Sequence, residues 1–314
     1  MTNERSRKPA GAPVLWLAVV LACCAIVRPS LAQELEVRLW SHLPDDTNFA
    51  SMAYVDTGAD INFDPALQIA DATMEMKTYM AAYQRSFALF GHSARIDLRQ
   101  PWKQATWTGT LAGAPAEVDR EGWGDTTARF SLLVLGAPPL EGAEYAAYRA
   151  AARDETIVGL GLAVDLPTGE YFSDKLLNIG SNRYTFRPQI GMVQNLGPWA
   201  FESTAMAAIF TDNNDFFGGG SFEQEPIYSL QGHVTYTFPD RFWLSAGAAG
   251  SMGGEVTVND VGKDDPKDSL FFGISAGYPV MQRLGLKLGY IGTRAQTATG
   301  SDSDSFILSL STFW

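Results

Sequence analysis

Charged residues recur at every second position in several stretches of the sequence. Arg95, Asp97 and Arg99 follow this spacing, and so do Glu75 and Lys77. Side chains two positions apart in a β-strand point to the same face, so acids and bases would stand next to each other there. Applied to every predicted strand, this reasoning selects Glu75, Lys77, Arg85, Arg95, Asp97, Arg99, Asp125, Arg129, Asp165, Arg187, Gln189, Glu202, Gln231, His233 and Lys287.

Two roles fit this set of residues. If the face that carries them meets water inside a barrel, opposed acids and bases would line a passage and set its charge preference. The same residues could instead form internal salt bridges that brace the wall. Both roles are consistent with the spacing, and they do not exclude each other.

The sequence offers little for catalysis or for metal binding. Hydrolysis by acyl transfer needs a nucleophile beside a base, and the three histidines are His42, His92 and His233. Of these, His233 would face inward near Thr235, which fits a polar wall residue better than a base. The acidic stretch 212–223 has Phe217 where a calcium loop of the EF-hand type needs glycine. We therefore expect no catalytic residue, no metal site and no cofactor.

Residues 1–32 have the layout of a secretory signal peptide. An apolar stretch follows a basic start and precedes a small-residue cleavage site, Ser30-Leu31-Ala32. The only two cysteines, Cys23 and Cys24, lie in that stretch, so we expect the exported chain to contain no disulfide. The formal net charge of −12 argues against nucleic acid as a partner, because such binding depends on Lys and Arg neutralising phosphates.

From residue 48 onward, apolar and polar residues alternate in about twelve segments, as they do in half-buried strands. The clearest segments have about ten residues, the length that a tilted strand needs to cross a bilayer. They are 156–166, 227–238, 269–278 and 305–314. In the first half we expect strands near 49–56, 73–87, 93–103 and 122–134, with loops at 57–72 and 104–121.

The connections between strands favour a membrane barrel over a soluble β-sandwich. Short turns at 195–198, 239–241 and 279–284 alternate with long polar loops. Transmembrane barrels have short periplasmic turns and longer external loops, whereas a sandwich has no reason for this alternation. The long loops are 213–226, 254–268 and 295–302. The Ala-rich segment 140–153 predicts a helix on the periplasmic side.

Aromatic residues gather at the ends of the predicted strands, as in the girdles of membrane barrels. The last strand ends on Phe313 and Trp314, which resembles the insertion signal that the barrel-assembly machinery recognises in bacterial outer-membrane proteins. We expect an all-β, transmembrane antiparallel β-barrel of about twelve strands with a short periplasmic helix. The barrel would cover 48–314, after an N-terminal periplasmic extension over 33–47.

Several stretches resemble the outer-membrane transporter family named for the MetA-pathway of phenol degradation. They are "GDTTARFSLLVLGAP" (124–138), "LAVDLPTGEY" (162–171), "NIGSNRYTFRPQIG" (178–191), "FTDNNDFFGG" (210–219) and "EQEPIYSLQGHVTYTF" (223–238). This resemblance implies a barrel of twelve or a similar number of strands that passes small molecules, aromatic ones among them. It supplies no catalytic or binding residues.

The sequence thus predicts a channel of the Gram-negative outer membrane for the passive passage of small solutes, with small aromatic or hydrophobic compounds as candidates. Its partners would be the solute, membrane lipid and lipopolysaccharide, which divalent ions could bridge to acidic external loops. One alternative is a barrel with a plugged lumen that serves as a structural or adhesive surface protein. A less favoured one is an outer-membrane hydrolase.

Overall fold

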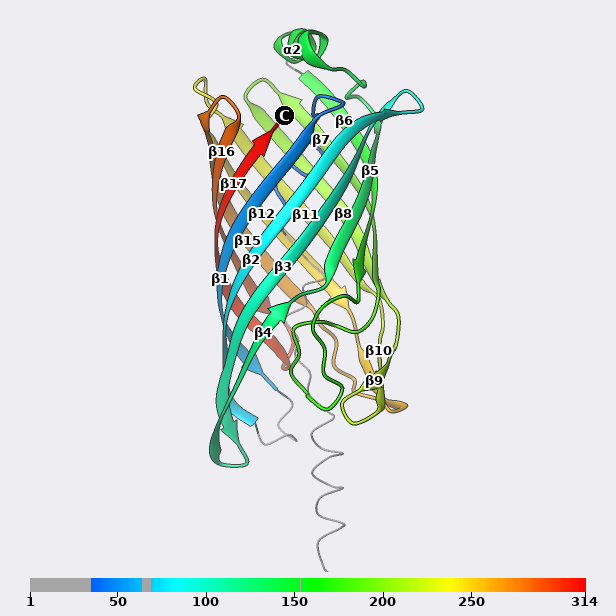
Figure 1. The fold of residues 1–314 in the computed structure, drawn as a ribbon, viewed down its shortest axis with the longest axis vertical. Coiled ribbons are helices and arrows are strands. Elements are labelled where there is room, and N and C mark those ends of the chain that lie inside the picture. Colours follow the sequence, from blue (N-terminus) through cyan, green and yellow to red (C-terminus); the bar gives the residue numbers. More distant parts are fainter. Residues whose placement is uncertain (1–34, 64–68, 153) are drawn as a thin grey trace, which may run out of the picture.

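The chain folds into a closed barrel of twelve antiparallel strands (Figure 1). The computed structural model describes residues 35–63, 69–152 and 154–314. The sheet closes because β1 (Asn48–Asn62) pairs with both β2 (Ile69–Leu89) and β17 (Gly300–Phe313). The other nine barrel strands are β3 (His92–Leu111), β5 (Thr126–Leu135), β6 (Asp154–Leu166), β7 (Thr185–Leu196), β8 (Trp199–Phe210), β11 (Ile227–Thr237), β12 (Trp243–Gly253), β15 (Ser269–Met281) and β16 (Leu284–Ala295). The predicted fold class and strand number are confirmed.

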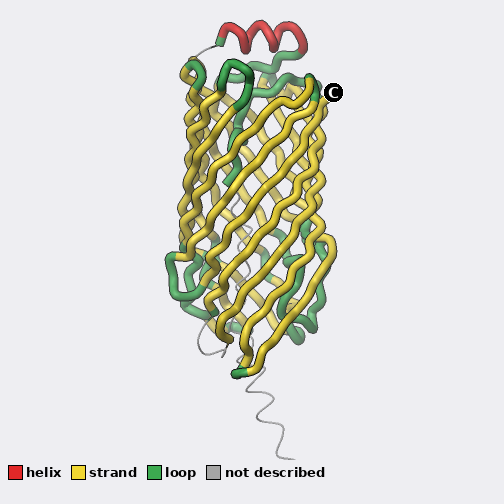
Figure 2. The backbone as a smooth tube through the Cα atoms, turned by 90° about the vertical axis from the view of Figure 1, so that its left-hand side faces the viewer, coloured by secondary structure: helices red, strands yellow, loops and turns green. Residues whose placement is uncertain are grey.

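The two ends of the barrel differ, as the loop lengths predict. The end with short turns also carries the C-terminus and the helix α2 (Gly142–Ala151), which lies where 140–153 was expected to be helical (Figure 2). No helix of the described residues is long and apolar enough to cross a membrane. At the long-loop end, two connections form a small separate sheet of β9 (Asn213–Phe216), β10 (Gly220–Gln224), β13 (Val256–Val258) and β14 (Val261–Gly262).

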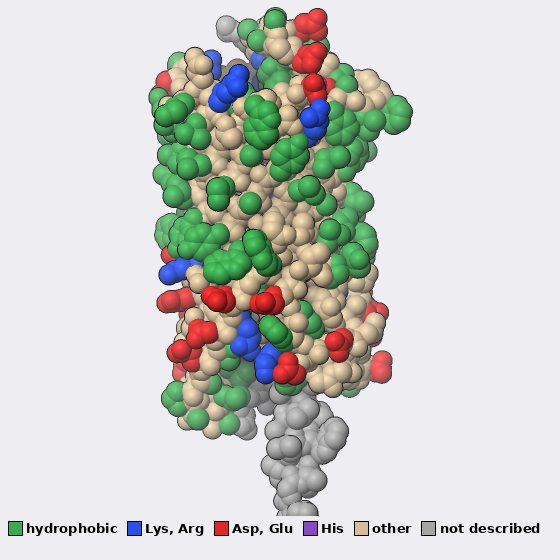
Figure 3. Space-filling model, in the orientation of Figure 1, with side chains coloured by type: hydrophobic (Ala, Val, Ile, Leu, Met, Phe, Trp, Pro, Cys, Tyr) green, Lys and Arg blue, Asp and Glu red, His purple; other side chains and the backbone are tan. Residues whose placement is uncertain are grey.

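The middle of the barrel is apolar outside and polar or small-residue inside. Leu160, Leu162 and Ile190 are exposed on the outer face, whereas their neighbours Gly161 and Gln189 point inward. Hydrophobic side chains lie among uncharged groups over the middle of the visible face, and charged ones gather toward its two ends (Figure 3). A closed sheet pairs its own backbone groups, so this arrangement suits hydrocarbon, where water is absent.

Toward the long-loop end this polarity inverts. An apolar cluster fills the inside there, and it includes Ile61, Met74 and Met76. The alternating residues of β2, Glu75 and Lys77, are exposed on the outer face. The inversion is physically reasonable because the wall beyond the lipid meets water outside and packs against itself inside.

Three predicted pore-lining residues are wrong, because they lie on parts of β2 near the two ends of the barrel. Glu75, Lys77 and Arg85 lie on the outer face of β2 and do not line the lumen. Arg85 is near the short-turn end, where it forms an exposed ion pair of 2.5 Å with Asp46. Their assignment rested on the rule that polar residues face inward, which holds only for the part of a strand inside the lipid.

The strands at the long-loop end are also longer than predicted. Residues 104–121, expected to be a loop, belong to the end of β3 and to β4 (Ala114–Trp123), which extends the line of β5 along β3. The tight turn between them uses Ala112 and Gly113 at φ of 49° and 82°. The expected loop 57–72 is likewise shorter, because β1 continues to Asn62 and β2 begins at Ile69.

Replacing Leu308 by arginine tests the lipid-facing assignment. Leu308 is exposed on the outer face of β17 between Phe306 and Leu310. We expect Leu308→Arg to lower the free energy of unfolding in vesicles by about 2–4 kcal/mol, the cost of a cation near the bilayer midplane. The measurement is urea unfolding of the barrel in lipid vesicles.

Ser309→Arg is the matched control, because Ser309 follows in the same strand and faces the lumen. We expect Ser309→Arg to lower the free energy of unfolding clearly less than Leu308→Arg does. Equal losses for the two variants would show that β17 does not present alternate faces to lipid and to water.

Candidate functional site

Eleven of the fifteen predicted pore-lining residues point into the barrel. They are Arg95, Asp97, Arg99, Arg129, Asp165, Arg187, Gln189, Glu202, Gln231, His233 and Lys287. Asp125 lies in the break between β4 and β5 instead. Its carboxylate accepts hydrogen bonds from the backbone N–H groups of Gly169 (2.9 Å) and Ser181 (2.8 Å), and so holds the long connection between β6 and β7.

Most of the segment before the first strand lies inside the barrel. We call residues 35–47 the plug segment. The backbone N–H of Leu39 donates to the Glu202 carboxylate at 3.0 Å, and Ser86 Oγ donates to the Pro44 carbonyl at 2.5 Å. We expect a periplasmic extension over 33–47, but residues 35–44 lie in the lumen, and the chain leaves it at Asp46, which pairs with Arg85 on the outer face.

Trp40 is the most deeply buried part of the plug segment. Its side chain is 1% exposed, and its indole Nε1 donates to Thr204 Oγ1 at 2.9 Å. The indole fits into a socket formed by the inward glycines Gly159, Gly161 and Gly191. A Cβ built on Gly191 would lie 1.8 Å from the indole nitrogen, and one on Gly159 would lie 2.2 Å from the ring. The wall can therefore accept Trp40 only because these positions have no side chain.

Apolar side chains complete the socket. Leu39 and Trp40 form a cluster with Leu133, Ile157 and Val193 of the wall. The sequence contained two signs of this contact: apolar residues in an otherwise isolated segment, and glycines at alternate positions of one strand. Neither sign identifies its partner, because the contact joins segments that are far apart in the sequence.

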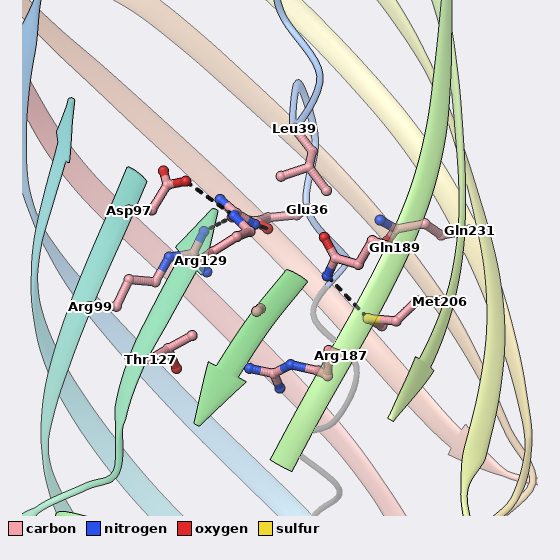
Figure 4. Close-up of a pocket in the computed structure, with 11 residues that line it drawn as sticks. Glu36, Leu39, Asp97, Arg99, Thr127, Arg129, Arg187, Gln189, Met206 and Gln231 are labelled. Carbon is pink, nitrogen blue, oxygen red and sulfur yellow. Dashed lines mark hydrogen bonds and ion pairs between the residues drawn. The ribbon is translucent and has the colours of Figure 1, made fainter. Parts of the chain in front are cut away.

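Acidic and basic side chains of the plug segment and the wall form one ionic network, part of which is shown in Figure 4. Glu36 binds both Arg99 and Arg129, with 2.5 Å between its Oε2 and Arg129 Nη1. Asp97 lies between Arg95 (3.1 Å) and Arg129 (3.2 Å). On the adjoining strands β6 and β7, Arg187 pairs with Asp165 at 2.5 Å. The alternating charges of the sequence are thus neighbours that form ion pairs, which both interpretations of these residues allow.

A small cavity, open to the rest of the lumen, lies beside this network. Its wall combines the charged groups with polar and apolar ones. Besides the network residues, Thr127, Gln189 and Gln231 contribute polar atoms, and Leu39, Ala163 and Met206 contribute apolar surface. Charged, polar and apolar side chains therefore line the same cavity within the lumen.

At the short-turn end, α2 closes over the plug segment. The His42 ring packs edge-on against Tyr145 and Tyr148, with ring centroids 5.0 and 5.4 Å apart. Its Nε2–H donates to the Pro138 carbonyl at 2.9 Å, and its buried Nδ1 finds no hydrogen-bond partner among the described residues. Burial lowers the pKa of His42, and only the weaker influences of the Pro138 carbonyl and Glu155 oppose this shift. The imidazole is held neutral.

The described residues contain no arrangement suited to acyl transfer around His233. The hydroxyl of Thr235 donates to Ser245 Oγ at 3.0 Å, and His233 Nε2 has no partner within the described part of the chain. The His233 ring instead lies over Gly247, where a Cβ would be 2.2 Å from it. Nor do three or more His, Cys, Asp or Glu side chains of the described ranges come together in a way that could hold a metal ion.

Comparison with known proteins gives one family and several related folds. The family model described as "Putative MetA-pathway of phenol degradation" matches residues 52–301. The COG4313 outer membrane channel from Pseudomonas putida F1 is similar in structure, with a TM-score of 0.74 and 20% identity over 90% of this chain and 100% of that one. The transport unit of the autotransporter AIDA-I from Escherichia coli has a TM-score of 0.50 and 11% identity, over 94% and 96% of the two chains. No curated protein sequence matches the chain.

Substituting a socket glycine tests how the plug segment is held. We expect Gly191→Ala to displace the Trp40 indole, because the added methyl group would overlap it. The loss of this contact should lower the free energy of unfolding by up to about 3–5 kcal/mol, the range for deleting a buried tryptophan side chain. Hydrogen exchange of residues 39–41 and urea unfolding measure the two effects.

Gly232→Ala provides the control, since a Cβ there meets nothing closer than the Glu202 carbonyl at 3.7 Å. It should leave exchange in the plug segment unchanged. If Gly191→Ala also leaves it unchanged, Trp40 does not need the socket.

Acid should loosen the contact between His42 and α2. Because the seated imidazole has a lowered pKa, this contact is fully stabilising above the ordinary histidine pKa of about 6.5 and is lost as the pH falls through the lowered value. Because opening is coupled to the uptake of one proton, the equilibrium constant for opening can rise by at most about ten-fold per pH unit. Hydrogen exchange of residues 41–45 across this pH range measures it, after correction for the intrinsic rate.

The His42→Gln variant should not show this extra opening in acid. The variant also distinguishes the effect of His42 from that of Asp45. Burial raises the pKa of Asp45, so its protonation in acid stabilises the seated plug segment instead of loosening it. Identical acid responses in the two proteins would assign the effect to a group other than His42.

Proposed function

The chain belongs to the family described as "Putative MetA-pathway of phenol degradation", and from this membership and its architecture we propose that it is a channel of the outer membrane for small solutes. The apolar outer band would face lipid, and the short-turn end with α2 would face the periplasm. Membrane lipid and lipopolysaccharide would surround the barrel, and the barrel-assembly machinery would insert it. Passage would be passive, because a solute needs only a path and a favourable lining.

The observation that carries this proposal is the way the lumen is filled. A barrel of eight strands is just filled by its own side chains, whereas one of twelve strands leaves additional space. Here that space contains the plug segment, which continues into β1 and is held by hydrogen bonds and ion pairs rather than as a strand of the sheet. A lumen filled by a separate segment can open without any change in the sheet.

The solutes that fit best are small molecules with an aromatic or apolar body. The family description concerns phenol degradation, and the similar protein from Pseudomonas putida F1 is called an outer membrane channel. The cavity is in keeping with such solutes, because its lining combines apolar groups with charges. A polar rim with apolar contacts is typical of sites for small organic molecules.

A plugged structural barrel is the second candidate, and one observation favours it. The plug segment is held by buried hydrogen bonds and by an almost fully buried tryptophan. If these contacts never open, the same barrel would carry no solute.

Removal of residues 35–44 separates the two functions. If the protein is a channel, the shortened barrel should show a several-fold higher conductance in planar bilayers than the full chain, because the residues that fill its lumen have been removed. The full-length chain should still allow liposomes to swell with small solutes such as phenol. The control is a barrel of unaltered length with Gly232→Ala.

The readout requires that both proteins be folded, which their different migration on gels before and after boiling establishes. A shortened barrel that is folded but neither conducts nor lets liposomes swell would favour the structural function.

A further inference from the structure

We propose that the place of Glu36 in the lumen is a binding site for the carboxylate of a small organic acid, and that Glu36 occupies it as an internal competitor. This inference rests on the proposed function only in that a solute must be able to reach the lumen.

The geometry around Glu36 is that of a recognised carboxylate. Its Oε2 accepts from Arg129 Nη1 at 2.5 Å, and its Oε1 faces Arg129 Nη2 at 3.5 Å. Arg99 binds Oε1 from the neighbouring strand. Two guanidinium groups thus hold one planar group through both oxygens, which is the mode in which arginine recognises carboxylates.

The wall builds this clamp without help from the plug segment. Arg99 and Arg129 come from β3 and β5, and the sheet fixes their Cα positions, since Arg99 is opposite Thr127 and Arg129 is opposite Asp97. Asp97 also binds Arg129 Nε at 3.2 Å. Both arginines therefore stay on the lumen wall when the plug segment leaves, and Arg129 keeps its ion pair with Asp97.

Charge also favours an anion at this place. Among the described residues, Asp97 pairs with Arg95 and Arg129, and Glu36 is a second carboxylate, shared by Arg99 and Arg129. Without Glu36, the almost fully buried Arg129 would lose one of these two carboxylates. Leaving buried cations unbalanced is costly, so the vacated clamp would attract a solute anion.

The surroundings select an organic acid rather than a bare inorganic anion. Leu39 follows Glu36 by three residues and lines the same cavity, together with Ala163 and Met206. The plug segment thus presents a carboxylate and a branched apolar group side by side. A solute that replaces both would carry one carboxylate on a small apolar or aromatic body.

Benzoate is a suitable probe, and its binding can be measured without conduction. Calorimetry on the detergent-solubilised full chain should show that Glu36→Gln binds benzoate at least about ten-fold more tightly than the unaltered protein. The factor follows because an internal competitor that fills the site nine-tenths of the time weakens the apparent affinity by that much. Adding Arg99→Gln and Arg129→Gln to this variant should abolish the gain.

Three comparisons make the result specific. Benzyl alcohol, which lacks the charge, should bind all variants equally. Glu36→Gln should increase the affinity for inorganic phosphate less than it increases the affinity for benzoate. Glu155→Gln removes another inward carboxylate, one bound to Arg149 at 2.6 Å near the short-turn end and far from the cavity lining, and should leave benzoate binding as it is.

The inference fails if Glu36→Gln binds benzoate no more tightly, or if benzyl alcohol or Glu155→Gln shows the same gain. Glu36→Ala is the second variant, to be used if Glu36→Gln does not fold, and the same outcomes apply to it. Absence of conductance would bear on the proposed function alone, because benzoate binding does not depend on passage.

Discussion

The structure depends on one constraint: every backbone donor and acceptor inside lipid has to be paired within the protein. A sheet satisfies this only by closing on itself, and here β1 closes it by pairing with β17 from Phe49 to Asn62. Closure fixes the circumference at twelve strands, and the circumference fixes the space inside. The plug segment, the inward glycines and the ionic network are all responses to that space.

The inward glycines show how tightly the wall and the plug segment are matched. Glycine weakens a strand because it contributes no side chain to packing. Gly159 and Gly191 nevertheless lie within β6 and β7, and the space above them on the lumen side is filled by Trp40. The wall thus gives up its own packing where a separate segment supplies it, which makes the segment part of the barrel's interior.

Much of the fold could be predicted from local sequence, but less of the site could. Strands inside the lipid, the loop alternation and the helix at 142–151 follow from periodicity and composition. Glu75 and Lys77 were misplaced because polarity inverts beyond the lipid, which alternation alone does not reveal. That Arg95, Asp97 and Arg99 share a face follows from spacing, whereas the pairing of Asp97 with Arg129 depends on the register of two strands. The contacts of Glu36 with Arg99 and Arg129 could not be predicted, because they depend on how the plug segment enters the barrel.

The two kinds of contact that hold the plug segment differ in what they contribute. Burying an indole of about 200 Å² stabilises by about 5 kcal/mol at about 25 cal/mol per Å². The Glu36 ion pairs add little net stability, because desolvation offsets most of their attraction, yet they demand one geometry. Trp40 therefore contributes most of the free energy that keeps the plug segment in the barrel, and Glu36 fixes where the segment lies. A competing carboxylate can take the place of Glu36 at small cost, while release of the whole segment also requires the indole to leave its socket.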